Sequence, residues 1–139
     1  MHMYLLDTNV VSELRRQKPH GGVVSWMKST PATALFVPAI VFEELQAGVE
    51  LTRLNDPAKA TAIEIWISEF EASANTLPAT ASIARETVRL MSGRPIQAYE
   101  DAVIAATAVI HEMTVVTQNT RDFTQFPVKT LDPFKHARR

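Results

Sequence analysis

Short apolar runs alternate with longer segments of helical periodicity along the whole chain. The runs at residues 4–6, 35–37, 115–117 and 128–131 have the length and composition of buried strands. Between them, apolar residues recur at three- and four-residue spacing, which is typical of helices that bury one face. Strands joined by helices form a mostly parallel sheet with helices on both faces. We therefore expect one three-layer α/β/α domain over residues 1–139.

Two helix boundaries are marked by the sequence itself. Asp56-Pro57 predicts a helix start, with Asp as the cap and Pro at the first helical position. Gly93 predicts the end of a helix that runs from about residue 80 to residue 92. The residues that we expect on the inward face of that second helix are Ala84, Val88 and Met91.

The composition excludes several classes of function. The chain has no cysteine, so a disulfide framework, a thiolate metal site and a cysteine nucleophile are all excluded. Its net charge is −1, which argues against a broadly basic nucleic-acid-binding protein. No apolar stretch approaches the roughly 18 residues of a membrane span, and the N-terminal apolar run stops at Asp7 without a signal-like pattern. We expect a cytoplasmic protein with no membrane contact.

Four carboxylates stand near predicted strand ends or helix starts. Asp7 directly follows the first strand, and Glu44 lies on the helix after the second. Asp101 opens an alanine-rich helix, and Asp122 follows the third strand. In an open parallel sheet, ligands bind at the carboxyl ends of the strands. An all-oxygen cluster of this kind suits a hard cation such as Mg²⁺ or Mn²⁺.

Each of these residues also has an ordinary structural interpretation. Asp7 and Asp122 are at positions that cap a helix or a turn, and Asp101 can complement a helix dipole. Glu44 follows Glu43, and both could lie on a solvated helix face. Four neighbouring polar residues are common turn formers: Thr8, Asn9, Thr117 and Asn119.

The segment Leu5–Glu13 resembles the opening of PIN-domain ribonucleases, particularly VapC-type toxins of bacterial toxin–antitoxin pairs and the related FitB group. Further segments resemble the family in the same order along the chain. These are Val37–Ile40 with Glu44–Val49, Asp101–Ala108, Val116–Phe123 and Leu131–Phe134. The resemblance covers nearly the entire chain and implies the PIN fold.

The resemblance also implies roles for individual residues. Asp7 and Asp101 would be the principal Mg²⁺ ligands, and Glu44 would complete the metal site. The family's Glu-Leu-x-x-Gly pattern, matched here by Glu44, Leu45 and Gly48, selects Glu44 rather than Glu43. Many members have an acid where this chain has Asn119, and others have Asn there and an acid three residues later. Asp122 is at that later position and is therefore the expected fourth catalytic acid. The polar residues that would support these carboxylates by hydrogen bonds, or lie beside them, are Thr8, Asn9, Thr117 and Asn119.

By resemblance, the expected function is that of a Mg²⁺-dependent endoribonuclease, with Mn²⁺ able to substitute. It would be the toxin of a VapBC-type pair, a homodimer inhibited by a VapB-type antitoxin, with DNA contacted only through the antitoxin. The expected substrate is a structured RNA, with transfer RNA the leading candidate. Because the overall charge gives no steering, candidate phosphate contacts are individual arginines: Arg15, Arg16 and Arg94, with Arg85 or Arg89 as a further candidate.

Three rival functions differ from this one in what they require. A haloacid-dehalogenase-like phosphatase needs a second acid two residues after the first, where this chain has Asn9. A phosphoacceptor receiver needs a further acidic pair near the first strand and a late lysine, and neither is present. A catalytically weak binding module for RNA or a protein partner stays open, because Asn119 brings no charge.

Overall fold

The computed structural model describes residues 1–138, and its centre is a sheet of five strands that are all parallel. The strands are β1 (Tyr4–Leu6), β2 (Leu35–Pro38), β3 (Thr76–Leu77), β4 (Thr114–Val116) and β5 (Thr130–Leu131). Their order across the sheet is β3-β2-β1-β4-β5. The chain thus builds the sheet outward from β1 to one side and then to the other. The carboxyl ends of β1 and β4 flank the point where this direction changes, which is where ligands bind in open parallel sheets.

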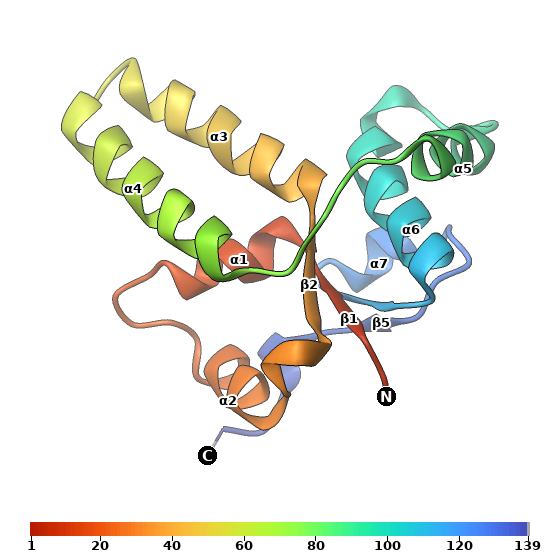
Figure 1. The fold of residues 1–139 in the computed structure, drawn as a ribbon, viewed down its shortest axis with the longest axis horizontal. Coiled ribbons are helices and arrows are strands. Elements are labelled where there is room, and N and C mark those ends of the chain that lie inside the picture. The colour runs from red at the N-terminus through yellow and green to blue at the C-terminus, as the bar shows by residue number, and fades with distance from the viewer. Residues whose placement is uncertain (139) are drawn as a thin grey trace.

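Helices cover both faces of the sheet (Figure 1). They are α1 (Thr8–Leu14), α2 (Gly21–Ser29), α3 (Ala39–Arg53), α4 (Pro57–Ser73), α5 (Ala81–Met91), α6 (Tyr99–His111) and α7 (Thr120–Phe123). Three 3₁₀ turns are η1 (Ala32–Ala34), η2 (Ile96–Ala98) and η3 (Pro133–Lys135). The structure therefore has the three-layer α/β/α arrangement expected from the sequence, and the sheet is fully parallel.

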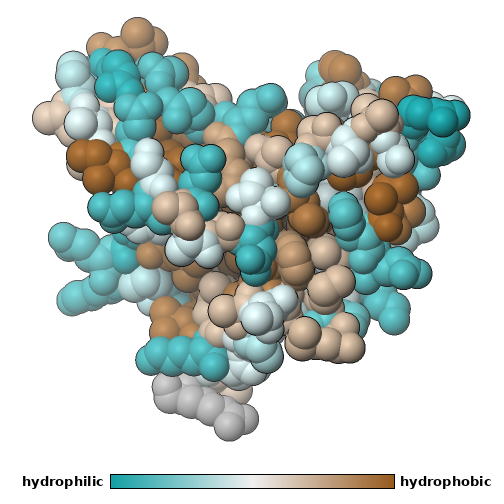
Figure 2. Space-filling model, viewed as in Figure 1, coloured by the Kyte–Doolittle hydropathy of each residue, from teal (hydrophilic) through white to brown (hydrophobic). Residues whose placement is uncertain are grey.

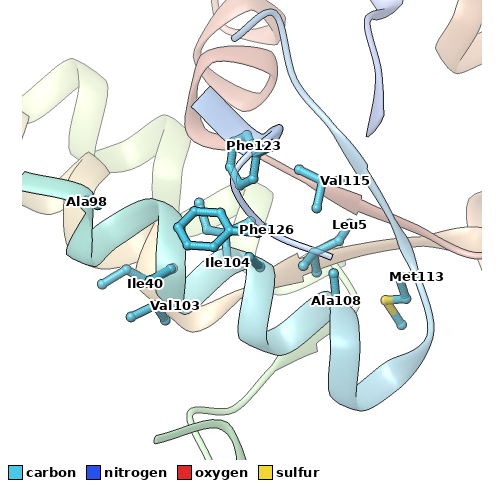
Figure 3. Packing of buried hydrophobic residues seen from close by; sticks show 12 residues of the cluster. Leu5, Ile40, Ala98, Val103, Ile104, Ala108, Met113, Val115, Phe123 and Phe126 are labelled. Carbon is cyan, nitrogen blue, oxygen red and sulfur yellow. The ribbon is translucent and has the colours of Figure 1, made fainter. Parts of the chain in front are cut away.

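Adjacent residues of β1 belong to opposite layers of the core, because side chains alternate across a strand. Leu5 packs in the cluster that contains Ile104 of α6 and Phe123 of α7 (Figure 3). Leu6 packs in the cluster that contains Val10 of α1 and Trp26 of α2. Both layers are anchored to this strand, so the residue that follows it is held in a fixed position.

Two helical arms rise above the carboxyl edge of the sheet. The α3–α4 hairpin has its own small core of Val49, Ala60 and Ile67, and α5 packs along α6. Figure 2 shows the arms as two lobes with a notch between them. Within residues 1–138, no helix combines the length and apolarity needed to cross a bilayer.

The predicted helix start at Asp56 is confirmed, since its carboxylate accepts a hydrogen bond from Lys59 N–H at 3.1 Å. The predicted inward face of α5 is wrong at Ala84 and Val88. Both are exposed, Val88 to 71%, and Ile83 and Thr87 are buried instead. Thr87 tolerates burial because its hydroxyl donates to the Ile83 carbonyl at 2.8 Å.

Candidate active site

Asp7 directly follows β1 and is only 5% exposed. Its backbone N–H donates to the Val116 carbonyl of β4 at 3.0 Å. Its Oδ1 accepts from Thr8 N–H at 2.7 Å and so caps α1. Burial raises the pKa of the Asp7 carboxyl, although the hydrogen bonds that it accepts oppose this. Asp7 is therefore both a helix cap and a desolvated carboxylate at the carboxyl edge of the sheet.

The completely buried Thr117 hydroxyl contacts Oδ2, the second carboxylate oxygen of Asp7. It donates to Asp7 Oδ2 at 2.8 Å, and it accepts from Asn119 N–H at 3.0 Å and from Asn9 Nδ2 at 3.1 Å. Asn9 Nδ2 also lies 3.1 Å from Asp7 Oδ2, while Asn9 Oδ1 accepts from Gln118 N–H at 3.0 Å. The single hydroxyl hydrogen and both lone pairs of Thr117 are used. This network ties the end of β4 to Asp7 and to α1.

The two adjacent glutamates of α3 face different surroundings. Glu43 is exposed, whereas Glu44 is half-buried and faces Glu100, Thr8 and Asp7. Burial, followed by repulsion from the Glu100 carboxylate, raises the pKa of Glu44 from 4.5 to about 8. The selection of Glu44 rather than Glu43 from the sequence agrees with this placement.

Asp101 lies in the first turn of α6 and is half-buried. Burial raises the pKa of Asp101 from 3.8 to about 6, with further contributions from the charges of Asp7, Asp122 and Glu100. Asp101 and Asp7 therefore share one electrostatic environment, although they are far apart in the sequence and come from different layers.

Asp122 is exposed on α7, and its charge raises the pKa of both Asp7 and Asp101. Within residues 1–138, hydrogen bonds involve only its backbone: its N–H donates to the Asn119 carbonyl at 3.1 Å, and its carbonyl accepts from Gln125 Nε2 at 2.9 Å. A capping role for the Asp122 side chain is therefore not supported. Asn119 is exposed and acts through its backbone N–H on Thr117.

The sequence analysis did not select Glu100. Its charge raises the pKa of the Glu44 carboxyl, and it raises the pKa of Asp101 as well. The signal was its position next to Asp101 in the first turn of α6. We call the set Asp7, Glu44, Glu100, Asp101 and Asp122 the acidic site.

The acidic site fits a hard divalent cation in its donor chemistry. All of its donors are oxygens, which suits Mg²⁺ or Mn²⁺ rather than zinc. The buried Thr8 hydroxyl faces Glu44 but has no formed hydrogen bond within the described part of the chain. Within residues 1–138, no three acidic or histidine side chains form a ready-made metal cage. Mg²⁺ usually binds through one or two carboxylates, waters and substrate phosphates, so it needs no such cage.

Arg15, Arg16 and Arg94 differ in their availability as phosphate contacts. Arg15 is exposed, and Arg16 is 68% exposed with one ion pair of 3.5 Å to Glu13. Arg94 is tied down instead: its guanidinium donates to Gln125 Oε1 at 3.0 Å and to the carbonyls of Leu90 and Gln125. It also lies 5.1 Å from the centre of the Phe126 ring. Arg94 thus braces the α5–α6 arm against the segment after α7, which argues against a free phosphate contact.

An acidic site at the change of direction in a parallel sheet, with α-helices in the outer layers, is the arrangement of a PIN domain. The PIN domain family model matches residues 4–129. The chain belongs to the PIN-domain family, as its sequence motifs predicted.

Relatives and solved structures agree along the whole length. The chain is 35% identical over 140 residues to Toxin FitB of Neisseria gonorrhoeae, covering 95% of this chain and 99% of that protein. It is 30% identical over 146 residues to VapC ribonuclease Y4jK of Sinorhizobium fredii, covering 97% and 100%. The structure of FitAB bound to an IR36 DNA fragment matches with a TM-score of 0.82, 31% identity and 99% coverage of both chains. The DNA-bound VapBC structure from Salmonella typhimurium shares the fold, with a TM-score of 0.76, 21% identity and coverage of 96% and 99%.

Proposed function

We propose that this protein is a divalent-metal-dependent endoribonuclease and the toxin of a two-component toxin–antitoxin pair. One observation carries the proposal: the hydrogen-bonded Asp7–Thr117–Asn9 network holds a buried carboxylate beside Asp101 and Glu44. Relatives named as a toxin and as a VapC ribonuclease, matched over almost their full length, support the same function.

The metal ligands in this proposal are Asp7, Asp101 and Glu44, with Asp122 as the fourth catalytic acid. Mg²⁺ is the expected ion, and Mn²⁺ can replace it. A bound divalent cation supplies a Lewis acid that activates water for attack on phosphorus and neutralises charge on the phosphate oxygens.

The protein's own residues supply orientation and proton acceptance. Thr117 and Asn9 fix the plane of the Asp7 carboxylate by hydrogen bonds to Oδ2. The Thr8 hydroxyl, buried and without a formed hydrogen bond within residues 1–138, can donate to a ligand in the site. Glu100, whose charge acts on both Glu44 and Asp101, offers a further carboxylate that can accept the proton lost by the attacking water.

The proposed substrate is a structured RNA, with transfer RNA the leading candidate, and the proposed location is the cytoplasm. Arg15 and Arg16 stay candidate phosphate contacts. The proposed partners are a second copy of the chain and a VapB-type antitoxin, through which DNA would be contacted. The matched FitAB structure is bound to an IR36 DNA fragment, which supports an assembly with a partner protein on DNA.

A second candidate function is a binding module with weak or no catalysis. One observation favours it: Asn119, at the position where the family resemblance implies an acid, brings no charge.

RNA cleavage by the purified protein separates the two functions. The assay compares Mg²⁺, Mn²⁺ and excess EDTA on a structured RNA, with Asp101→Asn as the matched inactive variant. We expect cleavage with either metal, none with EDTA, and none by the variant. Cleavage that survives EDTA, or equal cleavage by the variant, would point to a contaminating nuclease. RNA binding without cleavage would favour the binding module.

A further inference from the structure

The positive charge of this nearly neutral chain is concentrated in two segments. Residues 14–42 and 133–139 together contain seven of the fourteen Lys and Arg residues and none of the fifteen Asp and Glu residues. The rest of the chain is therefore strongly acidic. A charge distribution of this kind gives a localised positive potential despite the net charge of −1.

The fold brings residues 133–138 of the second segment close to the first, although the two segments are more than ninety positions apart. The turn η3 packs on α2, with the carbonyls of Pro133 and Phe134 so close to Gly22 that a Cβ atom there would lie 2.9 Å from each. The Phe134 ring lies 5.1 Å from the His20 ring, centre to centre. Figure 1 shows the C-terminal part of the chain beside α2, and Figure 2 shows hydrophilic side chains on the flank where the α1–α2 connection runs.

A hollow of about 460 Å³ lies at this junction, lined by Glu13, Arg16, Lys18, His20, Gln118 and Phe134. Glu13 organises the loop, because its carboxylate accepts from His20 N–H at 2.8 Å and pairs with Arg16 at 3.5 Å. Among the described residues, the ion pairs include neither Lys18 nor Arg138. The hollow therefore has uncompensated positive charge at its rim.

The contacts of His20 point to an anionic ligand. Its Nδ1 accepts from Gly22 N–H at 3.1 Å, and its Nε2 lies 3.0 Å from Nη2 of Arg138. A neutral imidazole has one acceptor nitrogen and a protonated one has none. One of these two donors therefore lacks an acceptor in any protonation state. A phosphate oxygen placed beside this contact could accept from the Arg138 guanidinium and leave the ring nitrogen to accept from Gly22.

The hollow is connected to the acidic site through Gln118. Its backbone N–H donates to Asn9, which in turn donates to Asp7. The seven residues of α1 (Thr8–Leu14) separate Asp7 from Arg15, and a helix of this length spans about 10 Å at 1.5 Å per residue. A single strand whose phosphate reaches Asp7 can therefore continue into the hollow.

We propose that this hollow binds the RNA strand beside the cleavage site, with Arg16, Lys18 and Arg138 on backbone phosphates and Phe134 against a base. Cations interleaved with aromatic rings are the usual basis of single-strand binding. The inference rests on the proposed function for the nature of the ligand, and it adds Lys18, Arg138 and Phe134 to the substrate contacts.

Binding is measured separately from cleavage, in the inactive Asp101→Asn background, by fluorescence anisotropy with a labelled single-stranded RNA of about 12 nucleotides. The test variant is Lys18→Ala/Arg138→Ala. The control is Lys59→Ala/Lys129→Ala, which removes the same charge from exposed positions on α4 and directly before β5. We expect the test variant to bind roughly tenfold more weakly, with a salt-dependence slope lower by about 1.4, because each lost single-strand phosphate contact removes about 0.7. The control should bind like the parent.

Two outcomes would overturn the inference. One is a Lys18→Ala/Arg138→Ala variant whose RNA affinity and salt-dependence slope equal those of the control variant. Binding of a labelled oligoglutamate peptide is measured in the same way. The other outcome is a test variant that binds RNA like the parent but no longer binds the peptide, which would identify an acidic protein segment as the occupant. Failure of the proposed function is distinguishable: metal-dependent cleavage would be absent while RNA binding still depends on Lys18 and Arg138. Thermal melting of each variant checks that it is folded, and Lys18→Gln with Arg138→Gln repeats the test with side chains of similar polarity.

Discussion

The hydroxyl of Thr117 donates a 2.8 Å hydrogen bond to Oδ2 of Asp7, across 110 positions of sequence. Both residues follow neighbouring parallel strands, β4 and β1, whose ends are aligned by the pairing of Leu6 with Val116. The register of the sheet thus positions Asp7, the most deeply buried carboxylate of the acidic site. The predictions below test this arrangement and the acids around it.

Thr117→Val keeps the shape of the side chain and removes one donor and two accepted hydrogen bonds. We expect a loss of about 1–3 kcal/mol of stability, because Asn9 and the Asn119 N–H lose a buried acceptor. Metal affinity should fall by about 10- to 100-fold, as for other groups that orient a ligand. Thr107→Val is the matched control, since its hydroxyl bonds only to the Val103 carbonyl of its own helix. Equal loss of metal affinity in both variants would contradict the positioning role.

Asp101→Asn and Asp7→Asn should both abolish cleavage, but they should differ in stability. Asp101→Asn removes repulsion within the acidic site, so its metal-free melting temperature should rise by a few degrees. In Asp7→Asn, an amide nitrogen that replaced Oδ2 would place a donor against Asn9 Nδ2 and the Thr117 hydroxyl, which are donors themselves. The melting temperature of Asp7→Asn is therefore not expected to rise. Circular dichroism melts with EDTA measure the difference. A stabilised Asp7→Asn would show that the hydrogen-bond network is not maintained in solution.

Glu43→Gln and Glu44→Gln test the register of α3. Only Glu44 faces the acidic site, and adjacent helical residues point about 100° apart. Glu44→Gln should reduce cleavage by an order of magnitude or more, whereas Glu43→Gln should stay within about twofold of the parent. Single-turnover cleavage at saturating metal is the measurement, and comparable losses in the two variants would refute the assigned register.

The raised pKa values predict how stability depends on pH without metal. In the folded protein, Glu44 holds its proton up to about pH 8 and Asp101 up to about pH 6, whereas the unfolded chain releases these protons near 4.5 and 3.8. The folded state thus binds more protons between these limits, so its stability should fall as pH rises from about 4 to about 8.

Chemical denaturation at pH 5, 6.5 and 8 with EDTA measures this slope. Glu44→Gln should flatten it between pH 6 and 8, Glu43→Gln should not, and added Mg²⁺ should restore stability at pH 8 by neutralising the carboxylates. A metal-free protein that gains stability from pH 6 to pH 8 would contradict the electrostatic description of the acidic site.

The fourth acid is tested by metal titration. Asp122 acts on Asp7 and Asp101 through its charge, without a hydrogen bond to its carboxylate in the described residues. Asp122→Asn should therefore weaken metal affinity and slow cleavage at low Mg²⁺, with partial recovery at high Mg²⁺. Asn119→Asp, which restores a charge next to the end of β4, should keep or raise activity. If Asp122→Asn binds Mg²⁺ as tightly as the parent, Asp122 has no role as a fourth acid.

The sequence by itself determined the local features of this protein. The positions of β1, β2, β4 and β5, the Asp56-Pro57 helix start and the placement of Asp7 after β1 follow from apolar spacing and capping chemistry, which act over a few residues. The two-residue strand β3 is too short to give such an apolar pattern. The choice of Glu44 rather than Glu43 came from a short motif. The family motifs also predicted the PIN fold.

Tertiary structure decided what each side chain faces, because that depends on segments far away in the sequence. Val88 fits an apolar stripe on α5, yet packing against α6 turned Ile83 inward and left Val88 exposed. The sequence predicted Arg94 to be a free phosphate contact, but in the structure Gln125, 31 positions later, accepts hydrogen bonds from its guanidinium. Glu100 joined the acidic site because α6 brings it to Glu44 on α3. His20 meets Arg138 across 118 positions, through packing of η3 on α2 that no local pattern encodes.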